Sequence, residues 1–178
     1  LVLGGNDPEG GHPAVIAQVP IVHARSHRTM SFAEIGRTPP RHLEPGSPVF
    51  SRDCLEVSVE RQDRRLDLFV CRFQASTAAS GLLDGLDPER KRRQAEAAAV
   101  RRVIERRYPD PSAAQWVILG NLADQPEDER GQPDPNHGLG ALFEDGFAVD
   151  LAGPGATRWT WFDLAGNRYR RHDHLLVS

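Results

Sequence analysis

The sequence predicts an α+β protein in which pairs of β-strands and one long helix pack as layers. A hairpin is expected because 54–60 alternates apolar and polar residues and 66–73 returns as a more apolar, central strand. A helix is expected from 87 to about 108. The short apolar stretch 115–120 after it has the composition of a strand buried on both faces. At 178 residues, these elements fit a single domain spanning 1–178.

Composition and charge narrow the classes of function. Hydrophobic residues make up 39% of the chain and charged residues 26%, which is ordinary for a globular protein. The net charge of −3 provides no overall attraction to nucleic acid or to an anionic membrane. No apolar run approaches the roughly 18 residues that span a bilayer, so no membrane partner is expected.

The two cysteines, Cys54 and Cys71, both fall in strand-like segments. Buried free thiols are the favoured interpretation, because a buried cysteine packs as a small hydrophobic residue. A disulfide would require the two strands to be paired neighbours and an oxidising compartment. The sequence does not distinguish a cytoplasmic from a secreted location.

Turns and short strands are expected in the N-terminal part. The glycine-rich cluster at 4–11 lacks the lysine and the following helix of a phosphate-binding loop, so a plain turn is favoured. Strands are expected at 14–17 and 21–24. The second strand is extended by polar side chains that alternate onto one face, where a solvated surface is favoured over a metal site. These side chains are His23, Arg25 and His27.

Capping residues mark two helix starts. Ser31 and Glu34 have the spacing of a capping box, which predicts one helical turn within a long loop. Asp87 followed by Pro88 predicts the N-terminus of the long helix, which runs to about Tyr108. Apolar residues of this helix recur with helical period and are expected to face the sheet. They are Ala97, Val100, Val103 and Ile104.

The long helix also carries most of the basic residues of an acidic protein. A solvated face covering a sheet is the favoured interpretation, because no aromatic or glycine residues interrupt the basic run. A nucleic-acid-binding module is the alternative, and its affinity would fall steeply with salt. The basic residues are Arg90, Lys91, Arg92, Arg93, Arg101, Arg102, Arg106 and Arg107.

Shorter elements are expected in the C-terminal part. A hydrophilic loop at 125–137 precedes a short helix at 137–144, which ends by Gly146. A strand at 159–162 is followed by a turn. The chain from Tyr169 onwards is expected to return as the partner of that strand and to continue into the final apolar run.

Several short segments carry a family resemblance through their order and spacing. They are 5–8, 25–28, 50–57, 68–73, the long Ala/Arg-rich helix, the strand end at Gly120, and 171–178. Together they resemble the later part of bacterial members of the endonuclease/exonuclease/phosphatase superfamily, the deoxyribonuclease I-like phosphoesterases. The resemblance implies a four-layer α/β sandwich of two packed, mainly antiparallel sheets with outer helices, and Mg²⁺-dependent hydrolysis of phosphodiesters or phosphomonoesters. The chain is expected to be a piece of a longer protein, incomplete at both ends.

The resemblance also implies where reacting groups would lie, and three of them are replaced. Arg72 stands where the family has a histidine, Asn121 where it has an aspartate, and Ala123 where it has an asparagine. Asp173 matches the family's Arg-x-Asp motif, with Arg171 also in place. An amide cannot carry the charge that holds a metal. A guanidinium cannot shuttle protons near neutral pH. Losing one such group costs on the order of 2.7–4 kcal/mol of transition-state stabilisation.

The leading hypothesis is therefore a catalytically degenerate member of the superfamily, with a scaffold or anion-binding role. A phosphate-containing ligand would bind through Arg72, Arg171 and His174, with Asn121 beside them. No activity is expected, and no cofactor is needed for this role.

The alternative is an active Mg²⁺-dependent nuclease, phosphodiesterase or phosphatase. It would use Asn121, Asp124 and Asp173 as catalytic residues, with Asp124 as the surrogate acid and Asn121 on the metal. Half of a two-sheet sandwich would also expose an apolar sheet face, so a homodimer formed through that face is expected as a risk.

Overall fold

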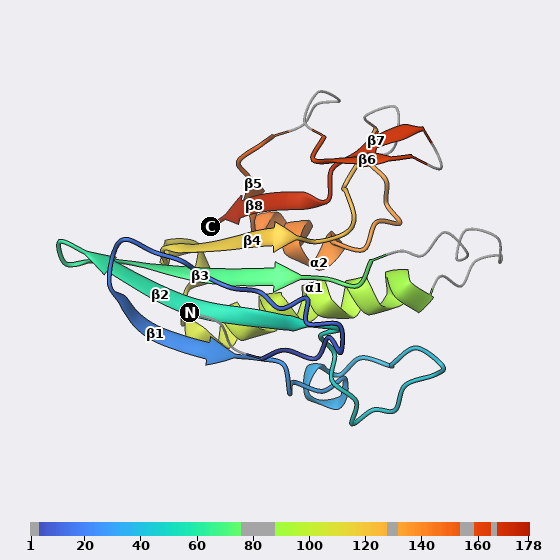
Figure 1. Cartoon of the computed structure of the whole chain (residues 1–178), viewed down its shortest axis with the longest axis horizontal. Helices are drawn as coiled ribbons and strands as arrows, with labels where there is room; N and C mark the ends of the chain where they lie inside the picture. The colour runs from blue at the N-terminus through green and yellow to red at the C-terminus, as the bar shows by residue number, and fades with distance from the viewer. Residues whose placement is uncertain (1–3, 76–87, 128–131, 154–158, 165–166) are drawn as a thin grey trace.

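Two β-sheets and one long helix make up the computed structural model, which describes residues 4–75, 88–127, 132–153, 159–164 and 167–178 (Figure 1). The larger sheet has six strands in the order β1-β2-β3-β4-β8-β5, and the smaller one pairs β6 with β7. This is a mixed α/β architecture. The strands are β1 (Ile21–Ser26), β2 (Asp53–Arg61), β3 (Arg64–Arg72), β4 (Trp116–Asn121), β5 (Val149–Asp150), β6 (Trp161–Asp163), β7 (Arg168–Arg170) and β8 (Asp173–Val177). The helices are α1 (Pro88–Arg107) and α2 (Gly140–Phe143), with 3-10 turns η1 (Ala33–Ile35), η3 (Pro111–Ala113) and η4 (Glu144–Gly146).

The predicted hairpin is present and its return strand is central. β2 and β3 pair antiparallel, and their two-residue turn places Gln62 and Asp63 at φ values of 51° and 60°. Positive φ at both central residues matches the twist of the flanking strands. β3 is the third of six strands, as predicted, and pairs with β4 in parallel. Parallel neighbours need a crossover connection, and α1 lies within it.

α1 covers one face of the large sheet with the predicted apolar stripe. Its four stripe residues are buried, and they share one core with Phe69 of β3 and with Trp116 and Ile118 of β4. The helix begins at Pro88, and the predicted N-cap Asp87 lies outside the described residues. The interaction that holds the helix to the sheet is therefore apolar burial along its length.

The opposite face of the sheet, which we call the open face, is apolar but thinly covered. Leu55 and Val57 are buried there with Val15, a residue of the N-terminal loop. Elsewhere on this face large apolar side chains are exposed. These are Leu66 at 37%, Leu175 at 43% and Val149 at 57% exposure.

The expectation that the strand at 115–120 is buried on both faces is wrong. Trp116 and Ile118 are buried under α1, whereas Val117 and Leu119 alternate onto the open face and are half-buried. The sequence run is apolar throughout because both faces of the strand are apolar. Of the two faces of β4, only the helix-covered one carries buried side chains in the described structure.

Polar side chains occupy the helix-covered face near the end of α1. Glu56 of β2 is buried and its carboxylate lies 2.9 Å from His27 Nε2 and 3.3 Å from Arg107 Nε. Burial alone would raise the pKa of Glu56, but the hydrogen bond and charge of His27, with the charge of Arg107, lower it. Asp67 of β3 accepts from Arg65 and from the Tyr108 hydroxyl. These acids are tolerated under the helix because each has a cationic or hydroxyl partner.

Two predictions about chain segments need correction, and one strand was not predicted. Residues 14–17 form no strand, because Val15 turns to the open-face cluster while Ile16 is fully exposed. The partner strand from Tyr169 stops at Arg170, and the next strand, β8, joins the large sheet beside β4. β5 was not predicted, since two residues leave no periodic signal.

Two local predictions are confirmed. The Ser31 hydroxyl accepts from Glu34 N at 3.3 Å, and Glu34 Oε2 accepts from Ser31 N at 2.7 Å, so the capping box precedes the 3-10 turn η1. Cys54 and Cys71 are buried free thiols, although they are direct cross-strand partners on β2 and β3. Among the helices of the described residues, none has the length and apolarity to cross a bilayer.

We expect the 178-residue chain to self-associate through the open face. Replacing Leu66 and Leu175 with lysine should decrease association, because the charges oppose burial of that face. The measurement is molar mass by light scattering over a concentration series. Leu164→Lys is the control, since Leu164 is 85% exposed in the turn after β6, outside the large sheet. Equal molar masses for the wild type and the double variant at all concentrations would contradict the expectation.

Candidate functional site

Three of the residues singled out in the sequence meet across the large sheet. Arg72 ends β3, Asn121 ends β4 and Asp173 begins β8. The strand register pairs Arg72 with Asn121, and Asn121 with Asp173. Directly paired residues lie on the same side of a sheet, and alternation from the helix-covered Ile118 places this row on the open face. We call Arg72, Asn121 and Asp173 the strand-end row.

The close approach of the β3 and β4 backbones fixes the position of the strand-end row. Gly120 has a φ of 129°, and a Cβ atom added to it would lie 2.1 Å from the carbonyl oxygen of Cys71. Only glycine allows β4 to approach β3 this closely. The pairing of Cys71 with Gly120 therefore sets the next residues, Arg72 and Asn121, side by side.

The Asn121 amide is oriented by its own turn. Its Oδ1 accepts from the backbone N–H of Ala123 at 3.1 Å, and Ala123 has a φ of 54°. With the oxygen engaged, the amide presents its NH₂ group as a donor. A donor at this position is suited to a ligand oxygen and unsuited to a cation.

The Arg72 guanidinium lies against the N-terminal glycine loop. A Cβ atom on Gly11 would lie 2.4 Å from Arg72 Nη1 and 2.5 Å from Asp7 Oδ2, so the loop backbone passes directly over both groups. The pKa of Asp7 is lowered, chiefly by the hydrogen bond from Glu9 N, and the charges of Arg52 and Arg72 lower it further. The loop predicted as a plain turn thus places a carboxylate next to the strand-end row.

The Asp124 carboxylate forms a hydrogen bond with a residue of α1. Its Oδ2 accepts from Arg93 Nε at 3.0 Å and from Gly138 N at 2.9 Å, and its Oδ1 accepts from Gln125 N at 2.9 Å. Arg93 is buried on α1, on the face of the sheet opposite to the row. The carboxylate therefore joins the helix to the turn after β4 and does not face Asn121.

Arg171 and His174 lie in an interior cluster instead of the strand-end row. Both contact Asp150, with Arg171 Nη2 at 3.0 Å and His174 Nδ1 at 3.1 Å from its Oδ2. Arg171 Nη2 also lies 3.4 Å from Glu127, and His174 Nε2 lies 2.8 Å from the carbonyl of Asp124. Burial would raise the pKa of Asp150, but the His174 hydrogen bond and the Arg171 charge lower it. This geometry does not bring either side chain to Arg72.

The strand-end row is held in place from the smaller sheet. The Thr160 hydroxyl accepts from the backbone N–H groups of His172 and Asp173 at 3.1 and 3.0 Å. The Trp161 ring stacks on His172 at a centroid distance of 4.7 Å. Figure 1 shows the β6–β7 hairpin beyond the carboxyl end of β4. The hairpin therefore fixes the start of β8 at the edge of the row.

The donor set of the row does not fit a magnesium ion. Mg²⁺ requires oxygen ligands in octahedral geometry, whereas the row offers a guanidinium, an amide with its oxygen engaged, and the single carboxylate of Asp173. Within the described parts of the chain, no cluster of histidine, cysteine and acidic side chains is arranged to hold a metal.

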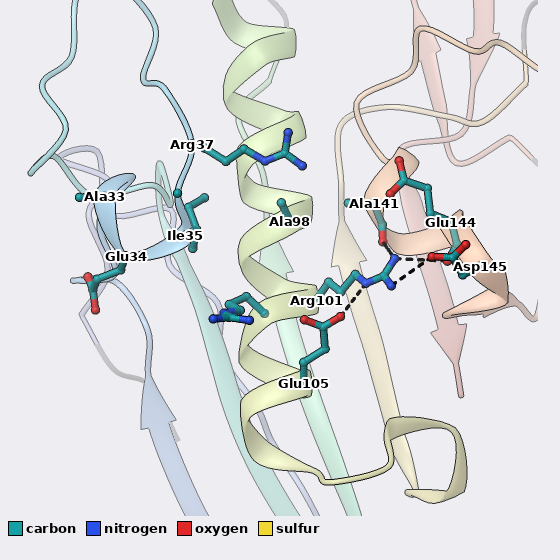
Figure 2. A pocket seen from close by; sticks show the side chains of 12 residues that line it. Ala33, Glu34, Ile35, Arg37, Ala98, Arg101, Glu105, Ala141, Glu144 and Asp145 are labelled. Carbon is teal, nitrogen blue, oxygen red and sulfur yellow. Dashed lines mark hydrogen bonds and ion pairs between the residues drawn. The ribbon is translucent and has the colours of Figure 1, made fainter.

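One arginine on the exposed side of the basic helix, Arg101, is paired with acids. A groove of about 520 Å³ lies beside α1. Figure 2 shows Arg101 pointing from the helix toward the groove residues Glu144 and Asp145. Arg101 Nε donates to Glu105 at 2.8 Å, and Arg101 Nη2 lies 3.6 Å from Asp145. The charged residues of this groove are of both signs, which fits the solvated, ion-paired face favoured from the sequence. They are Arg37, Arg101, Arg102, Glu34, Glu105, Glu144 and Asp145.

Asp7, Gly11 and Arg52 are the residues near the row that sequence reasoning missed. Arg52 Nε lies 3.0 Å from Asp7 Oδ2, and both side chains are largely buried. Asp7 and Arg52 lie in the segments 5–8 and 50–57 that carry the resemblance, but nothing there marked them as site residues, and the glycine cluster at 4–11 is equally typical of a plain turn. Their position depends on contacts more than forty residues apart in the chain.

Neither a scan of protein-family models nor a search of curated proteins finds a match to this chain. The superfamily resemblance therefore stays a prediction, and the chemistry of the site has to be argued from its residues.

Gly120→Ala should destabilise the fold by about 3 kcal/mol or more, because the added methyl group collides with backbone and the required φ is strained. The measurement is the free energy of unfolding in urea. Gly46→Ala is the control, since nothing lies within 4 Å of the atom it would add. Equal stability of the two variants would show that β3 and β4 do not approach as described.

Asp150→Asn should destabilise the fold by about 3 kcal/mol at neutral pH, because Arg171 and His174 lose a buried anionic partner. A carboxyl with a lowered folded pKa stabilises the protein above its ordinary value of 3.8 and loses that effect as the pH falls through the folded pKa. The difference between wild type and variant should therefore shrink only below pH 3.8. Denaturant unfolding over a pH series measures it, with Asp145→Asn, 88% exposed, as the control.

Proposed function

We propose that this chain is a catalytically degenerate member of the endonuclease/exonuclease/phosphatase superfamily that binds a phosphate group without hydrolysing it. The observation that supports the proposal is the strand-end row, in which Arg72 and Asn121 are direct neighbours. A guanidinium beside an amide NH₂ group offers donors to phosphate oxygens at the edge of the sheet. A four-layer sandwich, with a further sheet on the open face, belongs to the same proposal.

Binding is supported by the chemistry of the guanidinium. Its planar fork presents parallel N–H donors that match two oxygens of one phosphate. Arg72 is exposed, and its charge stays positive across the physiological range. The Asn121 NH₂ group adds a neutral donor from the next strand.

Hydrolysis is disfavoured by the same replacements. Attack of water on phosphate needs a base or a metal-bound hydroxide. Arg72 cannot accept a proton, and the row does not fit Mg²⁺. Asp124, the acid that an active enzyme would use as a surrogate, has both carboxylate oxygens occupied by donors. An active Mg²⁺-dependent phosphoesterase would first have to separate Asp124 from the buried Arg93, so that alternative has less support.

Arg72→Gln should weaken binding of inorganic phosphate at the row by about tenfold or more, because a charge-assisted hydrogen bond is lost. Backbone amide shifts of Asn121 and Ala123 in an NMR titration measure this affinity. Arg64→Gln is the matched control, since Arg64 is an exposed arginine at the opposite end of the same strand. If phosphate shifts these amides in both variants as it does in the wild type, the support for an anion site at the row is removed.

Hydrolysis is tested separately with an activated phosphodiester, bis(p-nitrophenyl) phosphate, in the presence of Mg²⁺. The wild-type chain should release no nitrophenol above background. Metal-dependent release that disappears in Asp124→Ala would overturn the degenerate assignment and favour the enzyme.

A further inference from the structure

A second hollow, separate from the groove beside α1, opens between the N-terminal loop, the segment before β2 and the first half of α1. Its volume is about 520 Å³. The charged side chains among its described lining are Asp7, Arg52 and Arg92. Two guanidiniums thus share one hollow with a single carboxylate, and we call it the Arg52–Arg92 hollow.

Arg92 enters this hollow from α1 and is held by neutral acceptors. Its Nε donates to the carbonyl of Val49 at 3.2 Å, and its Nη2 donates to the carbonyl of Pro48 at 3.3 Å. Nη1 makes no hydrogen bond among the described residues. Burial lowers the pKa of Arg92, Glu96 opposes this, and the like charge of Arg52 lowers it further. A half-buried guanidinium beside a second cation is electrostatically costly without an anion between them.

Arg52 approaches from the other side. Its Nε lies 3.0 Å from Asp7 Oδ2, and its Nη1 donates to the carbonyl of Phe73 at 3.2 Å. Within the described contacts its Nη2 has no acceptor. The same Asp7 carboxylate also lies beside Arg72 at Gly11. The Asp7 carboxylate therefore lies beside both Arg52 and Arg72. The two guanidiniums of the hollow outnumber its one carboxylate, so the charge of its lining is positive.

Glu96 is buried behind the hollow, and its carboxylate accepts its hydrogen bonds from residues other than Arg52 and Arg92. Glu96 Oε1 accepts from Ser51 N and Ser51 Oγ at 2.8 and 2.7 Å, and its Oε2 accepts from Gln74 N at 2.8 Å. Glu96 contacts the lining through these two residues and does not itself line the hollow. Burial raises the pKa of Glu96, whereas the hydrogen bonds from Gln74 and Ser51 and the charge of Arg92 oppose this.

We propose that the Arg52–Arg92 hollow is a second oxyanion site, which takes a phosphate group between the two guanidiniums. The free N–H groups of Arg52 and Arg92 supply donors, and the ligand neutralises the like charges. Asp7 forms the acidic wall of the hollow and weakens binding there. This site uses neither Asn121 nor Asp173, so it does not depend on the strand-end row.

The test is an NMR titration of the full chain with inorganic phosphate. Backbone amides of Ser51, Arg52 and Gln74 report on the hollow, and those of Asn121 and Ala123 report on the row. Arg92→Gln should weaken the response at the hollow by about tenfold or more, because a charge-assisted hydrogen bond is lost. It should leave the response at the row unchanged. Arg102→Gln is the matched control, an exposed arginine of the same helix outside this hollow.

Asp7→Asn supplies a variant that gains affinity. Removing the acidic wall should tighten phosphate binding at the hollow by about threefold to tenfold, since a like charge is removed beside the ligand. This gain cannot result from misfolding, so the proposal stays testable if Arg92→Gln fails to fold by circular dichroism.

The outcomes separate the two proposed sites. A response at the hollow that depends on Arg92 and survives Arg72→Gln supports the second site, whatever happens at the row. No response of the hollow amides at millimolar phosphate, in both the wild type and Asp7→Asn, overturns it. A hollow response that Arg72→Gln abolishes and Arg92→Gln leaves intact also overturns it, because the phosphate would then sit at the row.

Discussion

The position of the strand-end row depends on how closely β3 and β4 approach at Cys71 and Gly120. The missing side chain of Gly120 lets the two backbones meet where any other residue would collide with a carbonyl oxygen. This contact sets the parallel register, and the register sets Arg72 beside Asn121. α1 holds the same two strands from behind through a continuous apolar core.

Charge at this edge is arranged around arginine. An exposed guanidinium lies in the strand-end row, and two more line the neighbouring hollow. The Asp7 carboxylate lies among the three and is held by a loop that has no regular secondary structure. Groups of this kind bind anions well but cannot activate water, because a guanidinium does not release its proton near neutral pH. These residues are the basis on which we propose binding without hydrolysis.

Two acidic side chains are buried under α1, on the other face of the sheet from the strand-end row. Glu56 and Asp67 face α1, where a regular pattern would place apolar residues. Each is surrounded by donors that come from distant parts of the chain, including Arg107 and Tyr108 at the end of the helix. Such clusters fix how the end of the helix sits on the sheet, since a shift of either would leave a buried charge without its partner.

Local patterns in the sequence determined the β2–β3 hairpin, the central place of β3, the extent and buried stripe of α1, and the capping box at Ser31, because each depends on residues near one another in the chain. The sequence placed Asn121 directly after a strand, but it placed Arg72 inside the strand at 66–73 and Asp173 inside the segment that returns from Tyr169. Only the tertiary structure decided that β8 leaves its hairpin for the large sheet, that Asp124 and His174 turn to the helix side, and that Asp7 reaches Arg52. The physical reason is that strand order, side-chain facing and long-range ion pairs are fixed by packing between distant segments, which periodicity within one segment does not encode.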